Sequence, residues 1–151
     1  MATTSKFLMN EQIGGFTHKT VITHADLTET TAATAQTIAG PVVAVGSIVQ
    51  AVATYLKTDF ADASDAAFNS TAITVGDGSA ADRFITSQEL NTNGTEADAT
   101  IELHSTNTLP YAYTAADTVD VVFSAMTGKS LSNIDAGELW VFYNIVNLGD
   151  Q

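Results

Sequence analysis

The sequence has 151 residues, of which 45% are hydrophobic and 15% are charged, and this balance excludes an intrinsically disordered chain. Its 17 acidic and 5 basic residues give a formal net charge of −12, which argues against binding to nucleic acid or to an anionic membrane surface. The absence of cysteine excludes disulfides, thiolate metal sites and a cysteine nucleophile. The length fits one domain.

Residues 1–16 differ from the rest of the chain, and we expect an N-terminal arm there, followed by a single β-sandwich domain over 17–151. A packed arm and a loose tail both fit this composition, because chain termini are poorly ordered unless they are held. The segment lacks the apolar core of a signal peptide, and no part of the sequence has the length of a membrane span. The arm is small and polar, with these apolar anchors: Phe7, Leu8, Met9, Ile13 and Phe16.

Strand patterns dominate the rest of the sequence. Alternation of apolar and polar residues predicts half-buried strands at 70–75, 99–104 and 118–125. The runs 47–57 and 138–148 are apolar on both faces, which is typical of central strands that are covered on both sides. With three weaker candidates, the predicted strands in chain order are 19–24, 35–40, 47–57, 70–75, 83–87, 99–104, 118–125 and 138–148.

Turn signals rich in glycine, proline and asparagine separate these strands at short intervals. A parallel α/β fold would need amphipathic helical crossovers, and only 60–68 and 79–90 suggest even a short helix. We therefore predict an all-β fold, namely an antiparallel β-sandwich that is jelly-roll-like and has about eight strands. The turn signals lie at 39–41, 45–47, 76–78, 91–94, 109–111, 127–130 and 135–138.

The stretch ITVGDGSAADRF, residues 73–84, holds two glycines, two aspartates and the only arginine of the chain. A calcium loop supplies carboxylates at alternating positions, and this stretch does not. Its Gly-Asp-Gly segment instead predicts a tight turn with glycines at positive φ. We expect a structural corner, in which Asp82 beside Arg83 pairs locally or reaches a neighbouring strand.

A second acidic stretch places Asp59, Asp62 and Asp65 three residues apart. In a loop these carboxylates could hold one calcium ion, although no glycine or glutamate completes a known calcium-loop pattern. An acidic surface loop is the simpler interpretation.

The three histidines, His18, His24 and His104, form no metal-binding array. The first two would share a face of an extended strand but lie roughly 20 Å apart. A nucleophile elbow of the type G-x-S-x-G is also missing, since VGSIV around Ser47 lacks the second glycine. We expect no enzymatic activity, no cofactor and no metal.

The aromatic side chains gather late in the sequence, and strand 138–148 should carry some of them on its outer face. Leu139, Val141, Tyr143 and Ile145 alternate there with Trp140, Phe142, Val146 and Leu148. An exposed apolar patch of that size is a liability in a monomer. We therefore expect the Trp140 and Phe142 side to pack on a second subunit or on the arm.

Four stretches in order resemble the small virion structural proteins of tailed bacteriophages, of the capsid decoration (cement) type. They are THADLTETTAATAQTIAG, VGSIVQAVATYLKTDF, VGDGSAADRFITSQEL and the long run from PYAYTAADT to NIVNL, and together they span residues 23–148. The resemblance implies a jelly-roll or related β fold on the outer capsid surface of a virion assembled in the host cytoplasm.

The same resemblance implies the partners. A homodimer or homotrimer would clamp neighbouring subunits of the major capsid protein. The apolar anchors of the arm, with Trp140 and Phe142, are the interface residues that this function would use.

A carbohydrate- or receptor-binding module of a phage tail fibre or spike is the alternative function. Such a module displays aromatic side chains on a concave face, and Tyr55, Tyr111 and Tyr113 are the candidates. A calcium-dependent structural module is the third hypothesis.

Overall fold

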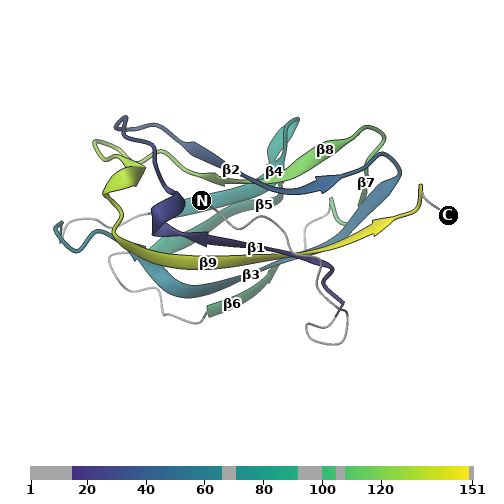
Figure 1. Cartoon of the computed structure of the whole chain (residues 1–151), viewed down its shortest axis with the longest axis horizontal. Coiled ribbons are helices and arrows are strands. Elements are labelled where there is room, and N and C mark those ends of the chain that lie inside the picture. Colours follow the sequence, from purple (N-terminus) through teal and green to yellow (C-terminus); the bar gives the residue numbers. More distant parts are fainter. Residues whose placement is uncertain (1–14, 66–70, 92–99, 105–107, 150–151) are drawn as a thin grey trace.

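The computed structural model describes residues 15–65, 71–91, 100–104 and 108–149, and within 100–104 it describes the backbone alone (Figure 1). Two 3-10 turns, η1 (His24–Asp26) and η2 (Leu131–Asn133), flank the strands. The strands are β1 (His18–Thr23), β2 (Gln36–Val43), β3 (Ser47–Ala61), β4 (Thr71–Asp77), β5 (Ala80–Asn91), β6 (Thr100–His104), β7 (Tyr111–Ala112), β8 (Asp117–Phe123) and β9 (Ala136–Asn147).

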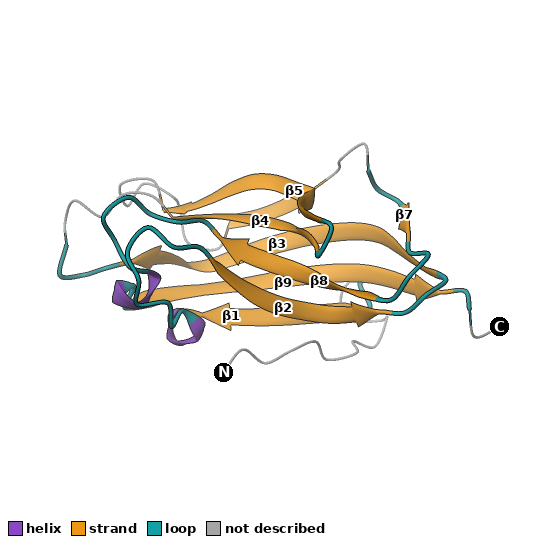
Figure 2. Ribbon diagram, turned by 90° about the horizontal axis from the view of Figure 1, so that it is seen from above, coloured by secondary structure: helices purple, strands orange, loops and turns teal. Residues whose placement is uncertain are grey.

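The strands form two packed sheets. One sheet has the order β1-β9-β3-β6, with β7 also pairing with β3, and the other has the order β2-β8-β4-β5. In Figure 1 the first sheet lies below the second, and Figure 2 shows the strands of both running along the long axis of the molecule. The prediction of an antiparallel all-β sandwich is confirmed, because every strand pair is antiparallel.

The strand order is that of a jelly roll. β1, β2, β3 and β4 pair with β9, β8, β6 and β5, so the four pairs are nested around the β4–β5 hairpin. These pairs form one long antiparallel ribbon with the β4–β5 hairpin at its tip. The ribbon is rolled up, so that β9 also pairs with β3 and β8 also pairs with β4, and this gives two four-stranded sheets. β7 is an extra two-residue strand beside β3.

The eight predicted strands coincide with β1–β6, β8 and β9, with ends that differ by a few residues. Residues 80–91 are strand β5, so the short helix considered at 79–90 is wrong. The turn signal at 39–41 is also wrong, because β2 continues through Gly40 and Pro41.

A β-bulge lets β2 pass through Gly40 and Pro41, where its register with β8 shifts between Ala39 and Val42. A Cβ on Gly40 would lie 2.2 Å from the carbonyl oxygen of Val119 on β8, so only glycine allows the two backbones to come this close. Proline is tolerated there because β2 is an edge strand that forms no ladder on its outer side.

The core fills the space between the two sheets. On β9 the inner side chains are Leu139, Val141, Tyr143 and Ile145, all buried, whereas Trp140 on the other face is half-buried. This alternation is the predicted one. On β3 a bulge between Val49 and Ala51 breaks the strict alternation of faces, so Val49 and Val52 are both buried.

Gly137 on β9 offers a test of how tightly the core is packed. Its φ is +140°, and a Cβ there would lie 2.5 Å from the ring of the buried Phe60. Backbone strain and the displaced ring should together lower the free energy of unfolding of Gly137→Ala by about 3 kcal/mol.

Gly128→Ala is the matched control, because Gly128 has φ +69° and no atom within 4 Å of the added carbon. Strain alone should lower its free energy of unfolding by about 1 kcal/mol in urea denaturation. Equal losses in the two variants would show that Phe60 does not restrict the site.

Candidate functional site

The stretch ITVGDGSAADRF, residues 73–84, contains the turn of the β4–β5 hairpin. Asp77 and Ala80 are paired across it, with Gly78 and Ser79 in the loop. The Asp77 side chain is only 1% exposed. Gly76 is needed because a Cβ there would lie 2.0 Å from the carbonyl oxygen of Ala80. The expectation of positive φ at the two glycines is wrong, since neither has it.

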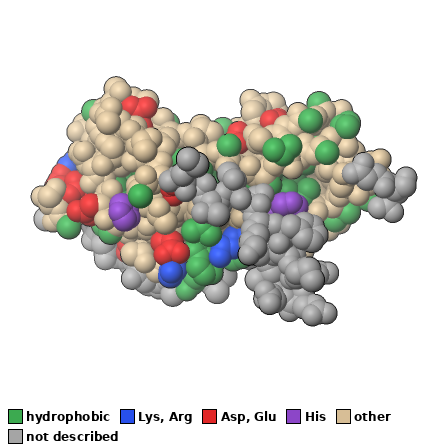
Figure 3. All heavy atoms as spheres, in the orientation of Figure 1, with side chains coloured by type: hydrophobic (Ala, Val, Ile, Leu, Met, Phe, Trp, Pro, Cys, Tyr) green, Lys and Arg blue, Asp and Glu red, His purple; other side chains and the backbone are tan. Residues whose placement is uncertain are grey.

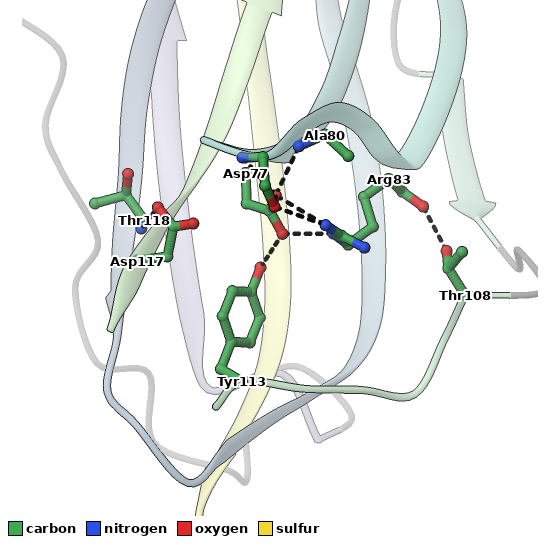
Figure 4. Close-up of polar contacts among 8 residues, drawn as sticks. Asp77, Ala80, Arg83, Thr108, Tyr113, Asp117 and Thr118 are labelled. Atoms are coloured by element: carbon green, nitrogen blue, oxygen red, sulfur yellow. Dashed lines mark hydrogen bonds and ion pairs between the residues drawn. The ribbon is translucent and has the colours of Figure 1, made fainter. Parts of the chain in front are cut away.

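Six hydrogen bonds converge on the Asp77 carboxylate (Figure 4). Oδ1 accepts from the backbone N–H of Ser79 at 3.1 Å, the Ser79 hydroxyl at 2.8 Å and the N–H of Ala80 at 2.9 Å. The Arg83 guanidinium donates to Oδ2 through Nε at 2.5 Å and to Oδ1 at 3.2 Å. The Tyr113 hydroxyl donates to Oδ2 at 3.0 Å. We call these four residues, with Asp77 at the centre, the Asp77 cluster.

The cluster keeps Asp77 ionised. Burial by itself would raise the pKa of Asp77, but the hydrogen bonds from Arg83, Ser79, Ala80 and Tyr113 outweigh it and hold that pKa at about 2. Burial, together with the bond to the ionised Asp77, raises the pKa of Tyr113 above its usual value. A neutral tyrosine and a charged pair are therefore the stable forms at neutral pH.

The Asp77 cluster also joins the two sheets. The backbone of Tyr113 is bonded to the start of β3, through Gly46 N–H to Tyr113 C=O at 2.9 Å and Tyr113 N–H to Ser47 C=O at 2.8 Å. Its hydroxyl reaches Asp77 in the opposite sheet. The guanidinium carbon of Arg83 lies 4.1 Å from the centroid of the Tyr111 ring, which adds a cation–π contact.

This geometry is that of a structural corner. Both carboxylate oxygens of Asp77 are filled by donors, so no lone pair is directed at a ligand. Of the two expectations for Asp82 and Arg83, local pairing between them is wrong, because Arg83 instead reaches Asp77 on the neighbouring strand β4 while Asp82 is exposed. Arg83 is also fastened through its carbonyl oxygen, which accepts a hydrogen bond from the Thr108 hydroxyl.

The acidic stretch at the end of β3 is likewise bound to its own surroundings. Asp62 Oδ1 accepts hydrogen bonds from the N–H and hydroxyl of Ser64, at 2.9 and 2.6 Å. Asp65 forms an ion pair with Lys129. Among the residues that the structure describes, no group of three or more His, Cys, Asp or Glu side chains is arranged to hold a metal ion.

The histidines are not brought together. His18 begins β1, and its Nδ1 lies 2.8 Å from the Thr17 hydroxyl, while burial lowers the pKa of its ring. His24 begins η1 at the other end of β1. The side chain of His104 lies outside the described part of the chain.

The outer face of the first sheet carries aromatic and charged side chains around Trp140. In Figure 3, hydrophobic, basic and acidic side chains lie close together at the lower centre of the molecule. Lys19 Nζ lies 3.3 Å from the centroid of the Trp140 ring, and the indole N–H donates to Glu138 Oε1 at 2.7 Å. Lys57 Nζ pairs with Glu138 Oε2 at 2.8 Å. The Tyr55 ring meets Trp140 edge-on, with centroids 5.3 Å apart. We call these side chains, with Phe16 and Phe142, the aromatic face.

Three of the predicted interface residues, Trp140, Phe142 and Phe16, therefore lie side by side here. Phe142 packs edge-on against Trp140 at 6.3 Å, and Phe16 packs on Phe142 at 5.8 Å between ring centroids. Sequence reasoning missed Lys19 and Lys57, because they reach Trp140 across neighbouring strands and the register was unknown. The other predicted arm anchors, Phe7, Leu8, Met9 and Ile13, lie outside the described residues.

The tyrosines that were candidates for a carbohydrate site do not share a face. Tyr113 is buried in the Asp77 cluster, and Tyr111 is half-buried against Arg83 and Phe84. Tyr55 belongs to the aromatic face. The expectation that the three form one exposed aromatic platform is wrong.

The contribution of the Asp77 cluster to the free energy of unfolding should depend on pH. Because the folded pKa of about 2 lies below the usual 3.8, ionised Asp77 stabilises the fold above that usual value. This contribution, about 2 kcal/mol, should be lost as the pH falls toward 2. Asp77→Asn should lower the free energy of unfolding at neutral pH by about 3 kcal/mol, because its amide faces donors.

The control is Asp82→Asn, which removes the same charge from an exposed side chain five residues away. It should change the free energy of unfolding by less than about 0.5 kcal/mol and keep the acid-dependent loss. If Asp77→Asn lost stability in acid as steeply as the unaltered chain, Asp77 would not be the group responsible.

The calcium hypothesis is tested by thermal unfolding. Millimolar calcium, and then an excess of chelator, should leave the melting temperature unchanged, because Asp62 and Asp65 are already bonded to Ser64 and Lys129. Magnesium at the same concentration controls for ionic strength. A rise in melting temperature with calcium alone would restore the metal site.

Among the described residues, none lies in a helix long and apolar enough to cross a bilayer. Comparison of the chain with protein-family models, with curated proteins and with solved structures finds no match.

Proposed function

We propose that the chain is a head decoration, or cement, protein of a tailed bacteriophage. It binds the outer surface of the assembled capsid and stabilises the shell by bridging subunits of the major capsid protein. The sequence resemblance over residues 23–148 supports this function, and a cysteine-free, acidic jelly-roll sandwich is compatible with it.

One observation carries the proposal furthest. Phe16, the last residue of the predicted arm, packs on Phe142 in the aromatic face. Phe16, Phe142 and Trp140, all suggested by the sequence as interface residues, thus belong to one surface. A contact that combines an arm with a sheet face can engage two neighbouring shell subunits at once.

The proposed mechanism is mechanical and needs no catalysis. Packaged DNA pushes outward on a thin shell. A protein that binds only the assembled lattice stabilises that lattice by mass action. Many symmetric copies then multiply a modest contact through multivalency. The saturated carboxylate of Asp77, which has no lone pair left for a substrate, fits this non-catalytic role.

Purified virions of the source phage provide the direct test. Mass spectrometry and electron microscopy should find the chain on the head in hundreds of copies. A handful of copies on the tail would favour the alternative, a receptor- or carbohydrate-binding module. Absence from the virion would end the proposal.

Variants then test the surface. Deletion of residues 1–16, and separately the double variant Trp140→Ala with Phe142→Ala, should weaken binding to heads that lack the protein by at least about tenfold. Thr86→Ala, at an exposed position on β5, is the control and should bind normally. Circular dichroism checks that each variant is folded. Full binding by both altered forms would show that this surface is not the contact.

A further inference from the structure

Lys19 differs from the other basic side chains in the described part of the chain. Its ammonium group lies over the Trp140 ring and forms no ion pair or hydrogen bond with another described residue. The other Lys and Arg side chains there all pair with a carboxylate, and the pairs are Lys57–Glu138, Arg83–Asp77 and Lys129–Asp65. Within that part of the chain, Lys19 therefore lacks a carboxylate partner, although the sequence holds 17 acidic residues.

The carboxylate of the aromatic face, Glu138, is already engaged. Its Oε1 accepts the hydrogen bond from the Trp140 indole N–H at 2.7 Å, and its Oε2 pairs with Lys57 at 2.8 Å. Burial lowers the pKa of Lys19, and attraction to Glu138 offsets this only in part. Two ammonium groups and one carboxylate give the aromatic face a net charge of +1, in a chain whose net charge is −12.

Apolar side chains surround this charge. Phe142 is opposite Lys19 in the strand register, with its ring centroid 5.8 Å from the ammonium nitrogen, and Val21 is opposite Trp140. These side chains and Tyr55 are half-buried, so part of each remains available for contact. A protein that covers this face buries apolar area and also removes water from Lys19. An ammonium group that loses its water without gaining an acceptor is costly to bury.

We propose that the aromatic face recognises an acidic side chain, Asp or Glu, which is flanked by apolar residues on the protein that covers this face. The carboxylate pairs with Lys19, and its apolar neighbours pack on Trp140 and Phe142. The inference rests on the proposed function, in which the covering protein is the shell subunit, and it adds the chemistry of the contact. The pair contributes to specificity, because a neutral or basic segment would leave Lys19 buried without a counter-ion.

The acidic character of the whole chain does not prevent this pairing. At physiological ionic strength, salt screens exposed charges that are more than about 8 Å apart. The carboxylate of the partner would contact Lys19 directly, and Lys57 Nζ, 5.5 Å from the Trp140 ring centroid, adds a second positive charge beside it. Attraction at the contact therefore acts at shorter range than repulsion from the remaining carboxylates.

Binding to heads that lack the protein tests the inference. Lys19→Met keeps an apolar stem and removes the ammonium group, so the dissociation constant should rise at least about tenfold. Lys19→Arg keeps the charge and should bind within about threefold of the unaltered chain. Lys129→Met is the matched control, because it removes the same charge from the turn after β8, and it should change the dissociation constant less than about twofold.

The outcomes separate this inference from the proposed function. If Lys19→Met binds heads as tightly as the unaltered chain does, the inference is wrong and the proposed function stands. If the unaltered chain does not bind heads, the proposed function fails instead, and the isolated chain then decides the inference. Circular dichroism checks that each variant is folded.

For the isolated chain the probe is 4-phenylbutyrate, which carries a carboxylate on an apolar stem. In proton–nitrogen NMR spectra it should shift the indole N–H resonance of Trp140, with a dissociation constant of about 1 mM. Its neutral amide, 4-phenylbutyramide, should bind at least about tenfold more weakly, and Lys19→Met should remove this preference. Equal binding of the acid and the amide, or no saturable shift up to about 50 mM, would overturn the inference.

Discussion

The ionised carboxylate of Asp77 is the interaction on which the arrangement of this sandwich depends. It lies at the tip of the β4–β5 hairpin, around which the other strand pairs are nested. Through Tyr113 it is bonded to a segment that is itself bonded to β3 in the opposite sheet. A buried charge is costly unless its hydrogen bonds are complete, and here six donors complete them. The same bonds therefore hold the hairpin turn, connect it to the Tyr113 segment and fix the position of Arg83.

The rolled ribbon also explains where the irregular positions occur. Long strands in a twisted sandwich must bend. The strands β3 and β2 bend at bulges near Val49 and Gly40. Glycine stands where backbones or rings approach too closely for a side chain, at Gly40 against Val119 and at Gly137 against Phe60. Residues that look like turn signals in the sequence thus serve as bends within strands.

Much of the fold could be predicted from the sequence, because period-2 alternation and turn residues are local signals. The eight main strands, the sandwich and the inner face of β9 followed from them. The long-range partners of Asp77 and Trp140 could not be predicted, since Tyr113 reaches Asp77 across 36 residues and Lys19 reaches Trp140 through strand register. The contact between the β2–β3 turn and the segment after β9 also needed the structure, because only the fold brings Gly46 beside Leu148.

The environment of Trp140 has a spectroscopic consequence. It is the only tryptophan of the chain, with an ammonium group against its ring and a carboxylate on its indole nitrogen. Intrinsic tryptophan emission therefore comes from a single place on the outer face of the β1-β9-β3-β6 sheet. A molecule that binds to that face and displaces Lys19 changes the wavelength and intensity of this emission, so its binding can be followed without an added label.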